Sequence, residues 1–436
     1  MGDCRTVFRN ESESDKLPIE RDMRPYGGSG RPHLSRTVLL FFIVSITVTS
    51  ALAAPANGVA KLRFRPNDAD TRAGFEHFYN LEYDQAIRYF EAAVTSHPND
   101  AFALNHLLSG VMFRELYRIG ALDTELYARN GFLTSKQFPI DAKAKERILG
   151  LMDQSLKLSE ARLKKNPDDV DALYTRGVVR GLRATYIGLI DKSWFAALRS
   201  AVGARHDHER VLELDPKYSD AKMAVGIHNY VIASVSWPVK VAASVIGLSG
   251  SKQRGIQYLF EAGEAGGETA VDSKIALSLF LRREQRYPEA LKLVGEMATD
   301  FPRNFLFRLE DANLMNAAGH GAEAIVAFRK IISDDEAGIF AKGQTRMEMV
   351  HYGLAEALRG QRRYEQAARE YDAVVASTRI DPDLRQRAQL GAGEMYDLLK
   401  KRDQAIQRYQ ALLASDKSSD HADLARRYLK QPYSAQ

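Results

Sequence analysis

The feature that most constrains this chain is that its sequence repeats itself. A short phrase, in which a turn leads into a helix with Ala at the fourth position, recurs at residues 83–87, 287–291, 364–368 and 402–406. A large side chain follows the Ala after four residues and another apolar residue follows three later, which is the spacing of one face of an α-helix. A single unit of this kind cannot bury its apolar face alone. We therefore expect the units to stack into a helical solenoid.

The repeat also predicts which residues pack between helices. The small residues expected at the closest helix contacts are Ala86, Gly255, Ala290, Ala324, Ala367 and Ala405. The large residues that follow them are Phe90, Val294, Phe328, Tyr371 and Tyr409. The third set consists of Ala93, Met297, Ile331, Val374 and Leu412. All three sets should lie in the core.

On these residues the chain resembles the tetratricopeptide repeat (TPR) family, whose unit of about 34 residues carries small, aromatic and Pro residues at matching places. The first unit, residues 67–100, matches at Gly74, Ala86, Phe90, Ala93 and Pro98, and the last matches at Gly393, Tyr396, Ala405 and Tyr409. The family's Trp at the fourth position is missing, and Arg308 and His351 stand there instead. The resemblance implies an all-α, right-handed superhelix of helical hairpins. Each hairpin should pack only against its neighbours.

The regularity of the repeat divides the chain into sections. Residues 67–116 hold the first unit and the start of the second, and 117–250 form an elaborated section with insertions at 117–145 and 231–250. Residues 251–417 form a regular array, and 418–436 are expected to be a capping helix and tail.

The N-terminal segment reads as an export signal. An uncharged apolar run at 37–54 follows Arg24, Arg31 and Arg36, and it ends in a small-x-small pattern at 51–53. This order is typical of a secretory signal peptide over residues 1–54, starting at Met1 or at Met23, and an uncleaved signal anchor is the alternative. Residues 55–66 would then be a linker. Both interpretations predict export to the periplasm or cell envelope.

Composition excludes several classes of function. The 61 Lys and Arg against 56 Asp and Glu leave a net charge of +5, too small at this length to indicate a nucleic-acid partner. The one Cys, Cys4, excludes a disulfide framework and a zinc site of paired cysteines. His206 and His208 would diverge on a helix and cannot easily share a metal ion. No metal or cofactor is therefore expected.

Catalytic motifs are incomplete. HExxH does not occur, residues 247–251 lack the final Gly of a nucleophile elbow, and residues 338–345 have Gln344 where a phosphate-binding loop needs Lys. We therefore expect a non-catalytic scaffold with no catalytic residue.

The TPR resemblance also predicts a binding surface, because the first helix of each unit lines the concave groove in that family. It places there Arg282, Asn313, Asn316, Tyr352, Glu356, Arg359, Arg387 and Glu394, and it adds Asp272 from the same unit as Arg282. Related domains hold an extended peptide or a helix in such a groove. A protein or peptide partner is therefore expected.

Two sets of basic residues allow further hypotheses. A stripe on one helix consists of Arg176, Arg180 and Arg183. It would be a solvated face, a set of pairs with acids of the next hairpin such as Glu209 or Glu213, or a site for an anion or carboxylate. The hairpin turns carry a basic ridge of Arg283, Arg286, Arg362, Arg363, Lys400, Lys401 and Arg402. This ridge would be either a solubilising rim or a contact with an anionic membrane surface. Residues 231–248 would be a buried accessory helix or, together with the ridge, a membrane-docking segment.

Overall fold

Helices in this chain begin where short polar side chains cap them. Asp68, Asp100, Asp141, Asp169 and Asp381 each precede a helix and accept a hydrogen bond from a backbone N–H in its first turn. A cap of this kind satisfies an N–H that the helix itself leaves unpaired. The hairpin turns end differently, with a left-handed residue two positions before the second helix. These residues are Leu81, Gln285, Gly319, Arg362 and Lys400, with φ of 64°, 59°, 88°, 57° and 60°.

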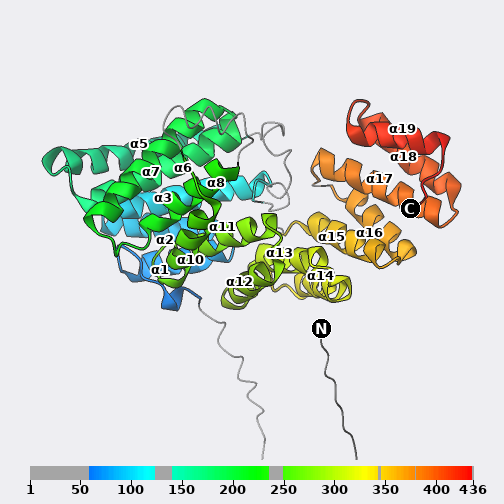
Figure 1. Ribbon diagram of the computed structural model, residues 1–436, viewed down its shortest axis with the longest axis horizontal. Coiled ribbons are helices and arrows are strands. Elements are labelled where there is room, and N and C mark those ends of the chain that lie inside the picture. The colour runs from blue at the N-terminus through cyan, green and yellow to red at the C-terminus, as the bar shows by residue number, and fades with distance from the viewer. Residues whose placement is uncertain (1–57, 123–139, 235–248, 342–344, 379, 435–436) are drawn as a thin grey trace, which may run out of the picture. The chain divides into compact units, whose positions relative to one another are not determined.

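The computed structural model describes residues 58–122, 140–234, 249–341, 345–378 and 380–434 (Figure 1), all within one compact unit, residues 52–436. The described part contains α-helices, two short helical segments of other pitch and no strand. The predicted signal and residues 55–57 lie outside it.

The helices form eight antiparallel hairpins and a final single helix within the described residues. The first four hairpins are α1 (Ala69–Tyr79) with α2 (Tyr83–Ser96), α3 (Ala101–Arg118) with α5 (Ala142–Lys165), α6 (Val170–Tyr186) with α7 (Trp194–Leu214), and α8 (Ala221–Ser234) with α10 (Lys252–Glu264). The next four are α11 (Ala270–Arg283) with α12 (Tyr287–Asp300), α13 (Phe305–Ala317) with α14 (Gly321–Glu336), α15 (Met347–Gly360) with α16 (Tyr364–Ala376), and α17 (Pro382–Leu398) with α18 (Arg402–Ser415). The expected capping helix is α19 (Asp420–Lys430). Two short segments complete the list, η1 (Gly58–Lys61) and the π-helical η3 (Ile187–Asp191).

The core confirms the predicted packing positions. The five predicted Ala residues and the aromatic residues Phe90, Phe328, Tyr371 and Tyr409 are completely buried. A Cβ added to Gly74 would lie 2.4 Å from the Phe90 ring, and one added to Gly110 of the next hairpin would lie 3.2 Å from it. The ring therefore fills a slot between two helices that only a residue without a side chain leaves open.

Ion pairs occupy the place of the family's Trp. Arg308 of α13 pairs with Asp334 of α14, and Nδ1 of His351 in α15 lies 2.7 Å from Oε2 of Glu370 in α16. Each pair joins the two helices of one hairpin, which is the role that a large ring would otherwise fill by packing.

Two expectations about the N-terminal part are wrong. Residues 58–66 are not a linker, because Val59 and Phe64 are buried in the core. The first hairpin also packs beyond its neighbour. The Tyr79 hydroxyl donates to Asp272 of α11 at 3.1 Å, and Asn304, after α12, donates to the Tyr79 carbonyl at 2.7 Å. The hairpins are therefore not joined by neighbour contacts alone.

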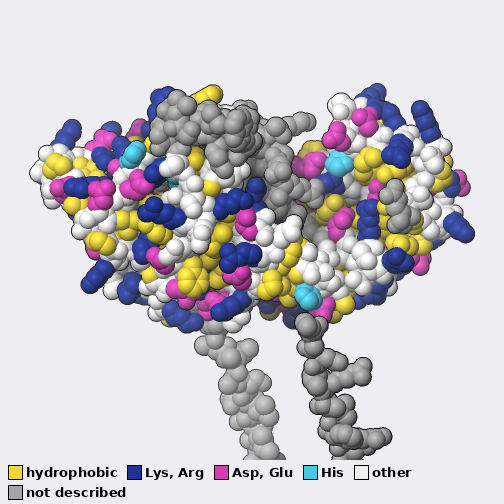
Figure 2. Space-filling view, in the orientation of Figure 1, with side chains coloured by type: hydrophobic (Ala, Val, Ile, Leu, Met, Phe, Trp, Pro, Cys, Tyr) yellow, Lys and Arg dark blue, Asp and Glu magenta, His cyan; other side chains and the backbone are white. Residues whose placement is uncertain are grey.

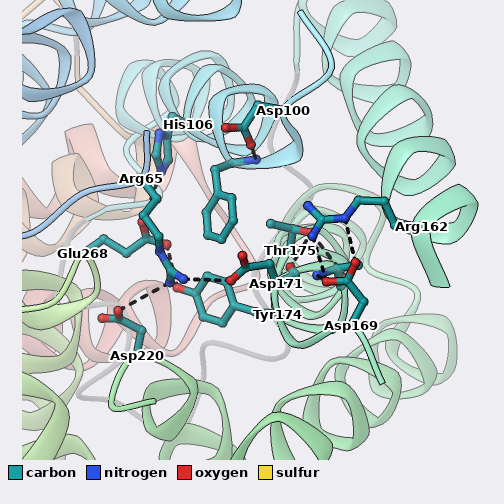
Figure 3. Close-up of polar contacts among 12 residues, drawn as sticks. Arg65, Asp100, His106, Arg162, Asp169, Asp171, Tyr174, Thr175, Asp220 and Glu268 are labelled. Atoms are coloured by element: carbon teal, nitrogen blue, oxygen red, sulfur yellow. Dashed lines mark hydrogen bonds and ion pairs between the residues drawn. The ribbon is translucent and has the colours of Figure 1, made fainter. Parts of the chain in front are cut away.

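Charged side chains of both signs are interspersed with hydrophobic ones on the face shown in Figure 2. Inside the fold, however, one cation holds several hairpins together (Figure 3). The Arg65 guanidinium lies 3.0 Å from Asp171 and 4.0 Å from Asp220, and it lies 4.4 Å from the centre of the Phe102 ring. Cation–π contacts of this kind add to the two ion pairs.

The acid opposite Arg65 is Glu268, between α10 and α11. Its Oε1 accepts a hydrogen bond of 2.8 Å from the Tyr174 hydroxyl, and its Oε2 lies 3.6 Å from Nε2 of His106 (Figure 3). Burial raises the pKa of Glu268, but the facing His106 ring, the charge of Arg65 and the hydrogen bond from Tyr174 outweigh it and hold the pKa below its usual value. A buried carboxylate is tolerated here because it has cationic and hydroxyl partners. The cluster joins the segment before α1 to residues of the second and third hairpins and to the loops before α8 and α11.

The predicted insertions are only partly described. α3 runs to Arg118 and α5 starts at Ala142, while residues 123–139 between them lie outside the described part. The 231–250 insertion starts as a continuation of α8 to Ser234, and residues 235–248 lie outside it. Among the described residues, no helix is both long enough and apolar enough to span a bilayer.

The slot around Phe90 gives a direct test of the packing. Replacing Gly74 by Ala should lower the free energy of unfolding by about 1–3 kcal/mol, because the new methyl group overlaps the Phe90 ring. Gly295 of α12 is the matched control, since nothing lies within 4 Å of its added Cβ. Gly295→Ala should be neutral or stabilising by up to about 1 kcal/mol. Urea unfolding measures both, and equal stability of the two variants would contradict the slot.

Candidate partner-binding groove

The regular half of the chain contains a small hollow of about 190 Å³ between first helices of successive hairpins. It is lined by Arg282, Leu309, Asn313, Asn316, Ala317, Met349, Tyr352, Gly353, Glu356, Leu384 and Arg387, which come from α11, α13, α15 and α17. Six of the eight predicted groove residues therefore lie around one hollow. They meet there because the repeat places equivalent positions of neighbouring first helices beside one another.

The wall formed by α11 and α13 is electrostatically balanced. Nη1 of Arg282 lies 2.9 Å and 3.0 Å from the two carboxylate oxygens of Glu310, and only 10% and 7% of these side chains are exposed. Breaking a pair this well buried leaves a charge without compensation, which is strongly destabilising. Arg282 therefore braces two helices as well as lining the hollow.

The opposite wall is aromatic and cationic. The Arg387 guanidinium lies 4.8 Å from the centre of the Tyr352 ring, and its Nε lies 3.1 Å from Oδ2 of Asp383. Glu356 accepts a hydrogen bond from the Tyr371 hydroxyl. These contacts hold the side chains of the wall in place before any ligand arrives.

Two amides supply the polar groups between these walls. Asn313 and Asn316 stand three residues apart on α13, so they lie on the same face of that helix. Within the described residues, neither amide has a hydrogen-bond partner among the side-chain and backbone groups around it. An amide carries both a donor and an acceptor, so it can pair with either group of a peptide backbone.

Arg359 and Glu394, the other two predicted groove residues, do not line the hollow. Arg359 lies 2.7 Å from Oε2 of Glu394 and donates to the Tyr433 hydroxyl at 3.2 Å. The backbone N–H of Tyr433 donates to Asp397 at 2.9 Å. The chain's own segment after α19 therefore contacts this pair. The sequence offered no periodic signal for that contact, because Tyr433 lies beyond the last repeat.

Asp272 is not a groove residue either. The resemblance placed it in the groove, but it lies against the first hairpin and accepts the hydrogen bond from Tyr79. Burial raises the pKa of Asp272 to about 6. The prediction that Asp272 lies in the groove is therefore wrong. It failed because the repeat pattern carries no signal for a contact between the first and fifth hairpins.

The predicted arginine stripe on α6 is mostly paired. Nη2 of Arg176 lies 2.6 Å from Oδ1 of Asp207, and Nη1 of Arg180 lies 2.8 Å from Oδ2 of the same residue. The prediction that Glu209 and Glu213 pair with this stripe is wrong, because these two acids pair with Arg205 and Arg210 of their own helix. Asp207 faces α6 and is almost fully buried, with 5% of its side chain exposed. Arg183 is exposed.

The two histidines beside Asp207 diverge as expected. His208 is buried against Tyr174, with ring centres 5.4 Å apart, and burial lowers its pKa. His206 points outward with 71% of its side chain exposed.

Six of the seven residues of the predicted basic ridge are exposed, and the seventh, Arg402, turns inward. Arg283, Arg286, Arg362, Arg363, Lys400 and Lys401 are exposed at the hairpin turns. Arg286 pairs with Glu289 at 2.6 Å and Lys401 with Glu365 at 3.5 Å. Arg402 is not part of an exposed ridge, because it turns inward to Asp397 at 2.8 Å and donates to the Tyr428 and Leu429 carbonyls. It fastens the capping helix to the last hairpin.

Glu394 makes the stability of this region depend on pH. Burial raises its pKa to about 7, although the Arg359 charge opposes the shift. Between about pH 4.5 and pH 7 the folded chain holds a proton that the unfolded chain has lost, so the free energy of unfolding falls as the pH rises. The loss should reach about 3 kcal/mol at most, and it should be absent in Glu394→Gln.

Urea unfolding at pH 4.5 and pH 8 measures this difference. Glu289→Gln is the control, because the exposed Glu289 has its pKa lowered by the hydrogen bond from Arg286, so its contribution to stability changes with pH in the opposite direction. An unchanged pH dependence in Glu394→Gln would contradict the assignment.

The part of the chain whose sequence matches a known family lies almost entirely in the regular array. Residues 352–422 match the sequence model of the tetratricopeptide repeat. No curated protein sequence matches the chain. Similar solved structures include a chain of the APC/C hetero-tetramer Cut9–Hcn1, with 13% identity and a TM-score of 0.47 over 83% of this chain and 55% of that one. This chain thus spans about half the length of that relative.

Two further structures resemble it at a similar level. Yeast Tom70 has 13% identity and a TM-score of 0.40, covering 83% of this chain and 94% of its own. Pseudomonas aeruginosa pilF has 16% identity and a TM-score of 0.38, covering 59% and 96%. The described residues form an all-α solenoid of helical hairpins, and within it residues 352–422 match the tetratricopeptide repeat.

Proposed function

We propose that this chain is a non-catalytic scaffold that holds an extended segment of a protein partner in the hollow between α11, α13, α15 and α17. The observation that carries the proposal is the pair of amides, Asn313 and Asn316, which lie beside the hollow with no hydrogen-bond partner among the described residues. They can pair with the N–H and C=O groups of an extended backbone.

The size and charge of the hollow support a peptide rather than a cofactor. A hollow of about 190 Å³ is smaller than the roughly 300–1,000 Å³ of usual small-molecule pockets. The cations Arg282 and Arg387 already face Glu310 and Asp383, so the walls have little net charge to attract a strongly charged ligand. The Tyr352 ring offers an apolar surface for one side chain of the partner.

The proposal includes a location in the cell envelope. Its support is the apolar run at 37–54 with basic residues before it and a small-x-small pattern at its end. N-terminal sequencing of the protein recovered from the envelope fraction should give a first residue at Ala54 or Pro55, directly after the small-x-small pattern. An N-terminus at Met1 or Met23 would favour an anchored protein, and recovery from the cytosol alone would contradict export.

A pair of amide variants tests the groove. The proposed partner should be captured by the wild-type chain and lost from Asn313→Ala/Asn316→Ala, because the backbone of its bound segment loses both amides. Gln404→Ala/Gln407→Ala is the matched control, since these amides have the same three-residue spacing on the outer helix α18. Cross-linked envelope proteins captured by each variant are compared by mass spectrometry.

Arg282 and Arg359 are left intact in this test, because Arg282 belongs to a buried ion pair and Arg359 contacts the buried Glu394, so removing either would perturb the fold. Identical protein lists from the wild type, the groove variant and the control would rule out this hollow as the binding surface.

A further inference from the structure

The elaborated half of the chain contains a larger cavity, well separated in sequence from the groove. It has a volume of about 440 Å³ and lies between α5, α6, η3 and α7, helices that pack side by side (Figure 1). It is lined by Leu156, Glu160, Arg180, Arg183, Ile187, Ala196, Arg199, Ser200 and Gly203. The volume falls within the roughly 300–1,000 Å³ of usual small-molecule sites.

Three of the lining residues are arginines, and they differ in their contacts. Arg180 is held in place by Asp207, which also accepts from Arg176 at 2.6 Å and 3.1 Å. Arg183 of α6 and Arg199 of α7 are exposed, and the described residues offer neither of them an ion-pair partner. The guanidinium groups of Arg183 and Arg199 therefore retain their capacity to donate hydrogen bonds toward the cavity.

The local charge balance is positive. Asp207 carries one negative charge against the two arginines that it contacts. Among the described residues that line the cavity, Glu160 is the only acidic one. Two acids, Asp207 and Glu160, therefore stand against four arginines, which are Arg176, Arg180, Arg183 and Arg199. An anion would be attracted to this cavity, and guanidinium groups suit the planar oxygens of a carboxylate or the oxygens of a phosphate.

The rest of the lining is apolar or small. Leu156 and Ile187 line the cavity with Ala196, and Gly203 has no side chain to fill it. Ile187 starts the π-helical turn η3, which ends at Asp191 and is followed by Lys192 with a left-handed φ of 52°. π-turns inside helices widen the local spacing and are frequent at functional sites. The cavity therefore combines cationic groups with an apolar wall.

We propose that this cavity binds a small amphipathic anion, with a carboxylate or phosphate headgroup held by Arg183 and Arg199 and a short apolar body against Leu156 and Ile187. Arg180, fixed by Asp207, gives the headgroup a third cation nearby. This ligand site goes beyond the proposed partner groove and does not depend on it, because the two share no residue.

Calorimetric titration of the chain from residue 55 onward tests the proposal with four probes: hexanoate, hexyl phosphate, hexan-1-ol and inorganic phosphate. Hexanoate or hexyl phosphate should bind, and which of them binds more tightly identifies the headgroup. The double variant Arg183→Ala/Arg199→Ala should weaken that binding by at least about tenfold, since each charge-assisted hydrogen bond is worth about that factor.

Two matched variants separate the site from general charge and from misfolding. Arg362→Ala/Arg363→Ala removes the same charge from an exposed hairpin turn and should bind as the wild type does. Ser200→Leu keeps every arginine but narrows the cavity, so it should lose the six-carbon probes. Circular dichroism melting should show all three variants folded at the titration temperature.

The remaining outcomes overturn the proposal. No binding of either hexyl anion to the wild type would remove the site. Equal binding of hexan-1-ol would remove the role of the arginines, and equal binding of inorganic phosphate and hexyl phosphate would remove that of the apolar wall. Unchanged affinity in both Arg183→Ala/Arg199→Ala and Ser200→Leu would place the ligand elsewhere on the chain.

Discussion

The structure depends on the large side chain that a hairpin places between helices, which is an aromatic ring against a glycine in the first, sixth, seventh and eighth hairpins. Phe90 shows the arrangement, with Gly74 on its own hairpin and Gly110 on the next one against the two sides of the ring. Tyr371 likewise lies against Gly391 of the following hairpin, and Tyr409 against Gly393. Because a Cβ does not fit at these glycines, each contact sets both the distance and the register of the helices. The contacts between neighbouring regular hairpins follow from that spacing.

The first hairpin adds a constraint that a simple repeat array does not have. Arg65 and the loop after α12 connect residues of the first hairpin and its N-terminal extension to the third and fifth hairpins. Arg303 strengthens this connection through Glu82 at 2.9 Å. The first five hairpins therefore share contacts between residues more than two hundred positions apart in the sequence. By contrast, α14, α16 and α18 pack on the helices next to them in sequence, and α15 and α17 add contacts to α13 and α19. Cooperative unfolding of the first group follows from these shared contacts.

The two candidate sites differ because one lies in the regular section of the chain and the other in the elaborated section. The groove lies in the regular half, where helices of 13 to 17 residues bring equivalent positions together. The cavity lies in the elaborated half, where α5 has 24 residues and α7 has 21, and where η3 interrupts the regular helix geometry. Regular packing places polar groups such as Asn313 and Asn316 in a row, which suits the repeating N–H and C=O groups of an extended peptide. Longer helices that diverge after a π-turn leave a volume between them, as a compact ligand requires.

The sequence by itself determined the helical hairpins, the buried small and large positions, and six residues around the groove, because all of these follow from contacts between neighbouring units in a fixed register. Only the tertiary structure decided that residues 58–66 are core, that Asp272 faces Tyr79, and that Tyr433 contacts Arg359. It also decided that Asp207, and not Glu209 or Glu213, pairs with Arg176 and Arg180 of α6. These contacts join residues whose separation is not a multiple of the repeat. They depend on how far the superhelix turns and on the rotation of one helix against another, and a local periodicity specifies neither.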